Sequence, residues 1–292
     1  MLIHQIVILP TNNKQITMKR IYNFLPLLLA LLVISCANPK KDKEKEGTST
    51  EKEKNEKQEA SKESAITLSK IDSFAQFPNA KLSMVKPESM EVPAGENTFQ
   101  FKVENYELRN QTSDAEMQGL ANSAKGQHVH FILNNGPYDA EYDNEFNKEL
   151  PVGDHVMLAF LSRSYHMSVK NENSYVIKKL RVGEPSKEKQ LDVDFTAPHL
   201  FYSRPKGTYS GDGAKKVLLD FFLLNTELEK GGNYVHVTIN GNEEFKVTEW
   251  APYAIKGMPM GENTIELELK DKEGNFIEGP FNKVKRTVTL EE

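Results

Sequence analysis

The chain has 292 residues, and its 37 Lys and Arg residues are outnumbered by 42 Asp and Glu, for a formal net charge of −5. This acidic balance argues against a nucleic-acid partner, which would select a basic surface. A single cysteine excludes an internal disulfide and every zinc or redox motif that needs paired cysteines.

The amino-terminal region has the pattern of a lipoprotein precursor. Lys19 and Arg20 precede an apolar run over 21–34, which is short for a transmembrane helix. The run ends in LVIS followed by Cys36, which resembles a bacterial lipobox. We predict that residues 1–35 are a leader and signal peptide, with Met18 a better start than Met1. Cys36 then carries the lipid that anchors the mature protein to a membrane.

Residues 36–65 have the composition of a tether. After the cysteine, this stretch is almost entirely Lys, Glu, Ser, Thr and Asn, with charges of both signs nearly balanced. Such a composition buries too little apolar surface to offset the entropy of ordering the chain. We therefore expect a flexible, solvated, charged spacer between the lipid and the folded part.

The remainder of the chain contains a tandem duplication. Four blocks of the first copy recur in the same order in the second. KP at 86–87 matches RP at 204–205, and FKVENYEL at 101–108 matches FFLLNTEL at 221–228. GQHVHFILN at 126–134 matches GNYVHVTIN at 232–240, and LPVGD at 150–154 matches MPMGE at 258–262. Ordered matches of this kind indicate repeated structural units. The repeats are expected at 66–183, with an insertion at 109–125, and at 195–292, joined by a linker at 184–194.

The repeat unit has the pattern of β-strands. Val235, Val237 and Ile239 alternate with polar residues, and the same period of two recurs over 265–269. Turn residues separate such segments often enough for about seven short strands per repeat. The predicted fold class is all-β, consisting of two tandem immunoglobulin-like antiparallel β-sandwiches.

Comparison of the two copies reveals an apolar outer face in the first. When HVMLAFL at 155–161 is aligned with NTIELEL at 263–269, Leu158 and Phe160 stand at the positions of Glu266 and Glu268. Ile132 likewise stands at the position of a threonine. A large apolar face requires a cover. The candidates are the second copy and the insertion, in which Ser113 or Asp114 is placed to cap a short helix that would act as a lid.

The same strand carries the histidines that would suit a metal ion. His128 and His130 lie two positions apart, so both side chains leave a strand on one side. With His155 they form our candidate metal site, for which copper or zinc is expected, and His166, Met157 and Met167 are available nearby. The alignment places Met157 on the core face, so convergence stays open. The alternative is that the histidines bond to the insertion or face solvent.

A second group of residues has the chemistry for an anionic ligand. SRSYH at 162–166 and SRPKGTY at 203–209 combine hydroxyls, cations and aromatic rings. We take Arg163, Tyr165, Arg204 and Lys206 as candidate ligand-binding residues, and add Tyr138 from an acidic, tyrosine-containing loop. Ordinary turns are the alternative for each segment.

Three segments resemble a known family. ANSAKGQHVH at 121–130, FLSRSYH at 160–166 and SRPKGTY at 203–209 are similar to a family of bacterial two-repeat lipoproteins, some of which are named phosphopeptide-binding proteins. The resemblance runs from about Ala80 to the carboxyl terminus. It implies export and duplication, and it points to Arg163, Arg204 and Lys206 as phosphate contacts.

These observations favour binding over catalysis. The chain has no Gly-x-Ser-x-Gly elbow, no His-Glu-x-x-His motif and no phosphate-binding glycine loop. The expected function is that of a non-enzymatic binding module, anchored by lipid in the cell envelope, at the outer membrane or cell surface rather than the inner membrane, with a protein or phosphopeptide partner. The alternative is a copper- or zinc-binding protein that uses the histidines of the first repeat, and no other cofactor is expected.

Overall fold

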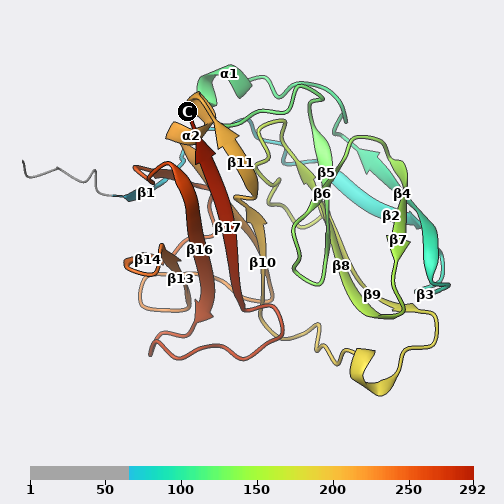
Figure 1. Cartoon of the computed structure of the whole chain (residues 1–292). Helices are drawn as coiled ribbons and strands as arrows, with labels where there is room; N and C mark the ends of the chain where they lie inside the picture. The colour runs from blue at the N-terminus through green and yellow to red at the C-terminus, as the bar shows by residue number, and fades with distance from the viewer. Residues whose placement is uncertain (1–65) are drawn as a thin grey trace, which may run out of the picture. The chain divides into compact units, whose positions relative to one another are not determined.

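The computed structural model describes residues 66–292 (Figure 1). The signal peptide, Cys36 and the tether lie outside the described residues, so their assignments stay predictions. In the described part no helix combines the length and apolar character needed to cross a bilayer.

The first repeat is a sandwich of two sheets. One sheet has the order β2-β4-β7, and the other has the order β3-β9-β8-β5-β6. The strands span Lys81–Lys86 (β2), Glu91–Val92 (β3), Gly95–Glu104 (β4), His128–Leu133 (β5), Asp139–Glu141 (β6), Glu145–Leu150 (β7), Gly153–Ser162 (β8) and Tyr175–Val182 (β9). Neighbouring strands are antiparallel except β3, which pairs parallel to β9.

The second repeat has the same topology. Its sheets have the orders β10-β12-β15 and β11-β17-β16-β13-β14, which are those of the first repeat with each strand number raised by eight. The strands span His199–Arg204 (β10), Gly207–Ser210 (β11), Val217–Leu224 (β12), Tyr234–Ile239 (β13), Glu243–Val247 (β14), Tyr253–Lys256 (β15), Gly261–Lys270 (β16) and Lys283–Glu291 (β17). The prediction of two tandem immunoglobulin-like sandwiches is confirmed, with eight strands in each where about seven were expected.

One strand departs from the expected repeat boundary. β1, Thr67–Lys70, lies in the sequence range assigned to the first repeat, but it pairs antiparallel with β15 of the second. It thereby extends the β10-β12-β15 sheet at the β15 edge. Exposed edge strands present unpaired backbone groups, and β1 supplies partners for those of β15.

Each sandwich encloses a core of alternating apolar residues. In the second repeat Val235, Val237 and Ile239 are buried together with Ile265 and other members of β16. In the first repeat the corresponding core contains Val129 and Phe131 together with Met157, Ala159 and Leu161, the three residues that the alignment places on the core face.

A third core forms where the outer faces of the two repeats meet. Its members are Ile132, Tyr138, Val156, Leu158 and Phe160 from the first repeat and Phe201, Phe222, Leu224 and Phe281 from the second. Phe160 and Phe222 stack with ring centroids 4.9 Å apart. β12 is consequently buried on both sides, because Val217, Leu219 and Phe221 face the second repeat's own core. The second copy, and not the insertion, covers the apolar face of the first.

The insertion packs elsewhere. Its short helix α1, Ala115–Gln118, follows Asp114 as expected, but the Asp114 carboxylate makes no capping bond and instead accepts from the Ala75 amide and the Tyr165 hydroxyl. Ala115 and Leu120 contact Tyr165, Met167 and residues of the second repeat. The lid over Ile132 and Phe160 is therefore wrong. A second short helix, α2, spans Asp212–Lys215.

The connection between the repeats is packed against the first one. It contains the 3-10 turn η1, Lys187–Lys189. The amide of Leu191 donates to the buried Asp154 carboxylate, which also pairs with Arg181. These contacts hold the pKa of Asp154 near 2, chiefly through the Arg181 hydrogen bond.

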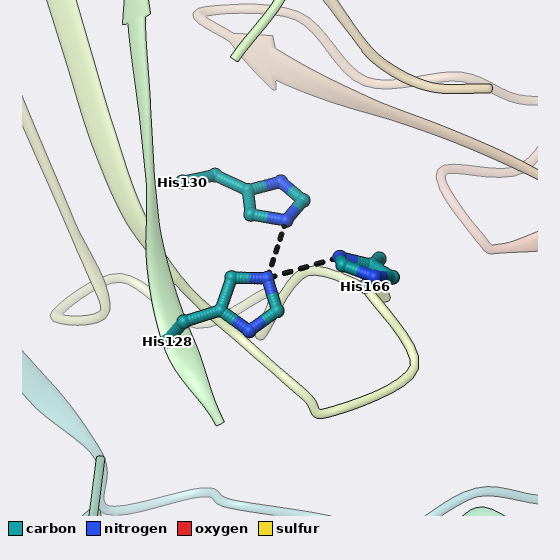
Figure 2. A group of neighbouring side chains, drawn as sticks. All are labelled: His128, His130 and His166. Carbon is teal, nitrogen blue, oxygen red and sulfur yellow. Dashed lines mark hydrogen bonds between the residues drawn. The ribbon is translucent and has the colours of Figure 1, made fainter. Parts of the chain in front are cut away.

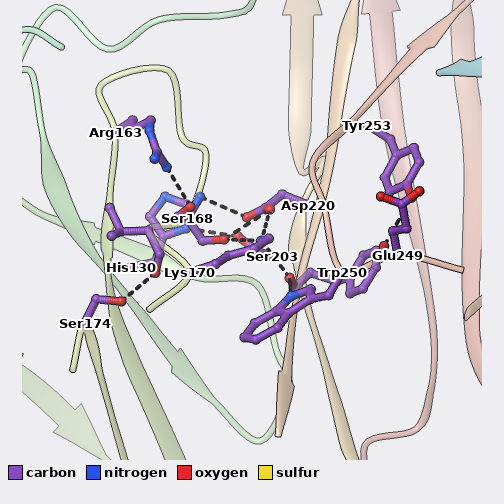
Figure 3. A network of polar contacts seen from close by, with 12 residues as sticks. His130, Arg163, Ser168, Lys170, Ser174, Ser203, Asp220, Glu249, Trp250 and Tyr253 are labelled. Atoms are coloured by element: carbon purple, nitrogen blue, oxygen red, sulfur yellow. Dashed lines mark hydrogen bonds and ion pairs between the residues drawn. The ribbon is translucent and has the colours of Figure 1, made fainter. Parts of the chain in front are cut away.

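A buried ion pair adds a polar contact between the repeats. Lys170, on the loop between β8 and β9, pairs with Asp220 of β12 at 2.5 Å, and the Asp220 side chain is 0% exposed (Figure 3). The amide and hydroxyl of Ser168 also donate to this carboxylate. A carboxylate with three donors is satisfied despite its burial, so this contact fixes how the loop meets β12.

Phe222→Ala should lower the free energy of unfolding by about 3–5 kcal/mol, because it leaves a cavity against Phe160 at the interface of the repeats. Lys102 occupies the equivalent position of the first repeat and is exposed, so Lys102→Ala should change stability by about 0.5 kcal/mol or less. Urea denaturation of both variants measures the difference. Equal losses would contradict the role of the interface.

Candidate metal centre

Three histidine side chains converge beside the interface of the repeats. His128 and His130 come from the start of β5, and their i and i+2 spacing aims both rings away from the first repeat's own core. His166 comes from the loop after β8, where its backbone has a left-handed φ of 67°. Figure 2 shows the three rings turned toward one another. We call these three residues the histidine cluster.

The distances within the cluster are short. His128 Nε2 lies 3.0 Å from His130 Nε2 and 3.0 Å from His166 Nδ1. All three ligand atoms lie within 4.8 Å of one another, and among the described residues this is the only cluster of three or more potential His, Cys, Asp or Glu ligands with that geometry.

Hydrogen bonding alone does not satisfy these contacts. The Gly126 carbonyl, 2.8 Å from His128 Nδ1, can only accept, so we assign the proton of the neutral His128 ring to Nδ1 and a lone pair to Nε2. That one lone pair faces two ring nitrogens, from His130 and His166, at the same 3.0 Å. It accepts one well-directed N–H, so the second contact is left without a full hydrogen bond.

Burial keeps the cluster neutral. His128 and His130 are fully buried and His166 is half-buried. Loss of hydration is the main cause that lowers the pKa of His128 from 6.5 to about 4. The same cause lowers the pKa of His130 and His166 well below the ordinary value, with a further contribution from Arg204. The three rings are therefore unprotonated at neutral pH, which is the state that binds metal ions.

Side chains of both repeats orient the rings. Ser203 of β10 lies 3.0 Å from His130 Nδ1, and the Tyr138 ring stacks on His130 with centroids 3.6 Å apart. The Tyr138 hydroxyl lies 3.2 Å from His166 Nδ1, the nitrogen that also faces His128, so this contact is to the inner nitrogen of the ring. A hydrogen-bond partner on the outer ring nitrogen is what orients a metal-binding histidine, and His128 and His130 each have one.

The predicted third ligand, His155, is not part of the cluster. Its Nδ1 contacts the Asn134 side chain at 2.9 Å, and its Nε2 contacts the Pro151 carbonyl at 2.9 Å. His155 lies near the start of β8, whereas His128 pairs with Ser162 at the end of that strand. His166 takes its place. The thioethers are also absent from the cluster, because Met157 lies in the first repeat's core and Met167 packs with the insertion.

The candidate anion-binding residues are engaged in internal contacts. Arg163 is 2% exposed and donates to the carbonyls of Ala75 and Ser168, the second of which appears in Figure 3. Tyr165 is buried against Asp114. The structure does not place Arg163 and Arg204 around a common site.

The cationic residues of the second repeat lie near the histidine cluster instead. Arg204 is 6% exposed and donates to the Tyr209 hydroxyl. Lys206 donates to the carbonyl of Tyr138. Tyr138, predicted as a loop contact residue, is thus buried between the cluster and these cations. The proximity of second-repeat residues to His130 could not be read from sequence spacing, because it depends on packing between the repeats.

Comparisons with known proteins do not identify a function. No family model matches the chain, and no curated protein matches it. Similar solved structures include the fibronectin(III)-like modules of CbhA from Clostridium thermocellum (11% identity, 72% of this chain and 94% of that chain, TM-score 0.25). The Bacteroides ovatus protein SGBP-B, in complex with a mixed-linkage heptasaccharide, gives 10% identity over 72% of this chain and 70% of that chain, with a TM-score of 0.23. Such loose superpositions carry no functional argument, and the fold assignment rests on the strand order described above.

The buried histidines should make metal-free protein sensitive to mild acid. The pKa of His128 is about 4 in the folded protein, compared with 6.5 for an ordinary histidine. Between these pH values the unfolded chain binds more protons, so stability is complete above about 6.5 and falls as the pH is lowered toward 4. Urea midpoints measured with a chelator from pH 7 to 4.5 should decline, and less steeply for His130→Phe. A flat wild-type profile would contradict the assignment.

Proposed function

We propose that this protein binds a metal ion through His128 Nε2, His130 Nε2 and His166 Nδ1. The observation that carries the proposal is the single lone pair of His128 Nε2, which faces two other ring nitrogens at 3.0 Å. A metal ion among the three nitrogens would accept one lone pair from each and remove the conflict.

The dimensions and surroundings of the cluster support this proposal. Metal–nitrogen bonds of about 2.0–2.1 Å in a tetrahedral site put the nitrogens about 3.3 Å apart. The two 3.0 Å contacts of His128 would open by a few tenths of an ångström, and His130 Nε2 and His166 Nδ1, which lie within 4.8 Å of each other, would move to the same separation. With Nε2 on the metal, His130 Nδ1–H would donate to Ser203 Oγ, and His128 Nδ1–H already donates to Gly126. Both rings are then fixed in the tautomer that metal binding needs.

The phosphate-binding alternative receives less support. A phosphate site needs donors free to turn toward the ligand, whereas Arg163 donates to two backbone carbonyls and Lys206 to a third. A protein or peptide partner elsewhere on the surface stays a prediction. Binding without catalysis also remains our proposal for the chain as a whole.

Attachment to the envelope forms the second part of the proposed function. The lipobox-like segment ending at Cys36 and the charged spacer after it support a lipid-anchored protein held outside the cytoplasm. In that arrangement the spacer carries the metal-binding repeats away from the membrane, at the outer membrane or the cell surface.

His166→Asn should weaken metal binding by about 10- to 100-fold or more, because loss of a ligand should cost at least as much as the loss of an outer-shell partner. Asparagine tolerates the left-handed backbone of this position, so the loop should keep its conformation. His155→Asn is the matched control and should bind like the wild type. Competition titrations with copper and zinc measure both. Equal binding by the wild type and the His166 variant would refute the proposed site.

Cys36→Ser should abolish incorporation of labelled palmitate and block cleavage before residue 36, because the lipid is attached to the thiol. Metabolic labelling followed by membrane fractionation measures both effects. An unlipidated wild type, or a serine variant processed and fractionated like it, would contradict the anchor.

A further inference from the structure

We propose that the histidine cluster selects a monovalent soft ion, copper(I), over divalent ions such as zinc(II). This inference rests on the proposed function and concerns the charge of the ion. It follows from the balance of charged groups around the three rings.

Two cations from the second repeat lie behind the ring that covers His130. Lys206 Nζ is 4.2 Å from the centroid of the Tyr138 ring. The His130 ring stacks on the Tyr138 ring with centroids 3.6 Å apart and so covers one face of that ring. The Lys206 ammonium must therefore lie over the other face of the Tyr138 ring. The Arg204 guanidinium lies 5.5 Å from the same centroid. Both cations add positive potential at the cluster, and both lower the pKa of His130 and His166.

Arg204 is poorly compensated. It is 6% exposed, its Nε has no hydrogen-bond partner, and no carboxylate of the described residues forms an ion pair with it. Asp220, its register partner on β12, pairs with Lys170 instead. A buried cation without a counterion of its own keeps much of its field, since little water screens it.

No acid balances this charge at the rings. Among the described residues, no carboxylate contacts a nitrogen of the cluster. The acids of β6, Asp139 and Glu141, both pair with Lys148, and Asp139 also attracts the Lys206 ammonium and offsets part of its charge. His236, which takes the place of His130 in the second repeat, has the opposite environment, because it lies within 3.5 Å of both Glu244 and Glu268. The cluster therefore offers three neutral ligands in a positive surrounding.

This surrounding penalises a second positive charge. The cost of moving an ion out of water grows with the square of its charge, and its repulsion by Lys206 and Arg204 doubles from a monovalent to a divalent ion. Imidazole ligands suit both copper and zinc, so the ligand atoms do not discriminate between the two ions and the charge does. Three donors complete a common coordination of copper(I). Zinc(II) at three histidines normally adds a water as its fourth ligand, which leaves the charge of the ion uncompensated unless that water loses a proton.

The test compares the two ions on the full chain. Copper(I) affinity is measured without oxygen by competition with a chromophoric copper(I) chelator, and zinc(II) affinity by competition with a zinc dye. Each titration is repeated with His166→Asn, Lys206→Met and Lys246→Met. Lys246 is the matched control, because its Nζ lies 3.8 Å from the Tyr234 ring centroid in the second repeat, and it is exposed.

We expect the wild type to bind copper(I) more tightly than zinc(II), in a manner that depends on His166. Lys206→Met should reduce that preference about tenfold, as removal of a charge roughly 10 Å away at an effective dielectric constant of about 20 implies. Lys246→Met should leave the preference unchanged. Binding of zinc(II) as tightly as copper(I), or a preference that Lys206→Met does not alter, would overturn the selectivity and leave the metal site standing. If His166→Asn bound both ions as tightly as the wild type does, the metal site itself would be refuted.

Discussion

The packing of one outer face of the first repeat on one outer face of the second is the interaction on which the rest of the structure depends. Phe160 and Phe222 form its centre, and the aromatic and aliphatic side chains around them exclude water from both surfaces. Each repeat already has its own core, so the pair becomes one unit through this third core, with the smaller cluster around Tyr165 and the Lys170–Asp220 pair beside it. Without it β5 would have one wet face, as β13 has.

The burial of the histidines follows from that packing. His130 and His236 occupy equivalent positions in the duplicated strand, yet His130 is fully buried while His236 is only partly buried and lies between two glutamates. The difference arises outside the strand itself, because Ser203, Arg204 and Lys206 approach His130 from the second repeat. The same contact therefore removes water from the rings, orients one of them and sets the charge around them. One copy of the duplicated module therefore carries a buried histidine cluster, and the corresponding strand of the other copy does not.

Much of the fold could be predicted because its signals are local. The alternation of Val235, Val237 and Ile239 defines a half-buried strand whatever lies beyond it. Replacement of Glu266 and Glu268 by Leu158 and Phe160 predicted an apolar outer face in the same way. The site was predicted only in part. His128 and His130 share a face by the geometry of a strand, but whether His155 or His166 completes the group depends on the path of a loop, and no periodicity describes that path.

The sequence by itself determined the duplication, the strands of each sandwich and the side of β5 on which the two histidines lie, since these follow from spacing along one segment. Only the tertiary structure decided that the second repeat covers the first, that β1 joins the second repeat's sheet, and that His166 meets His128. Those contacts join residues distant along the chain, and they form because burial of apolar area and completion of backbone hydrogen bonds favour them in three dimensions. The same is true of Arg204 and Lys206, which the sequence predicted as ligand contacts and which the packing of the repeats brings close to the histidine cluster.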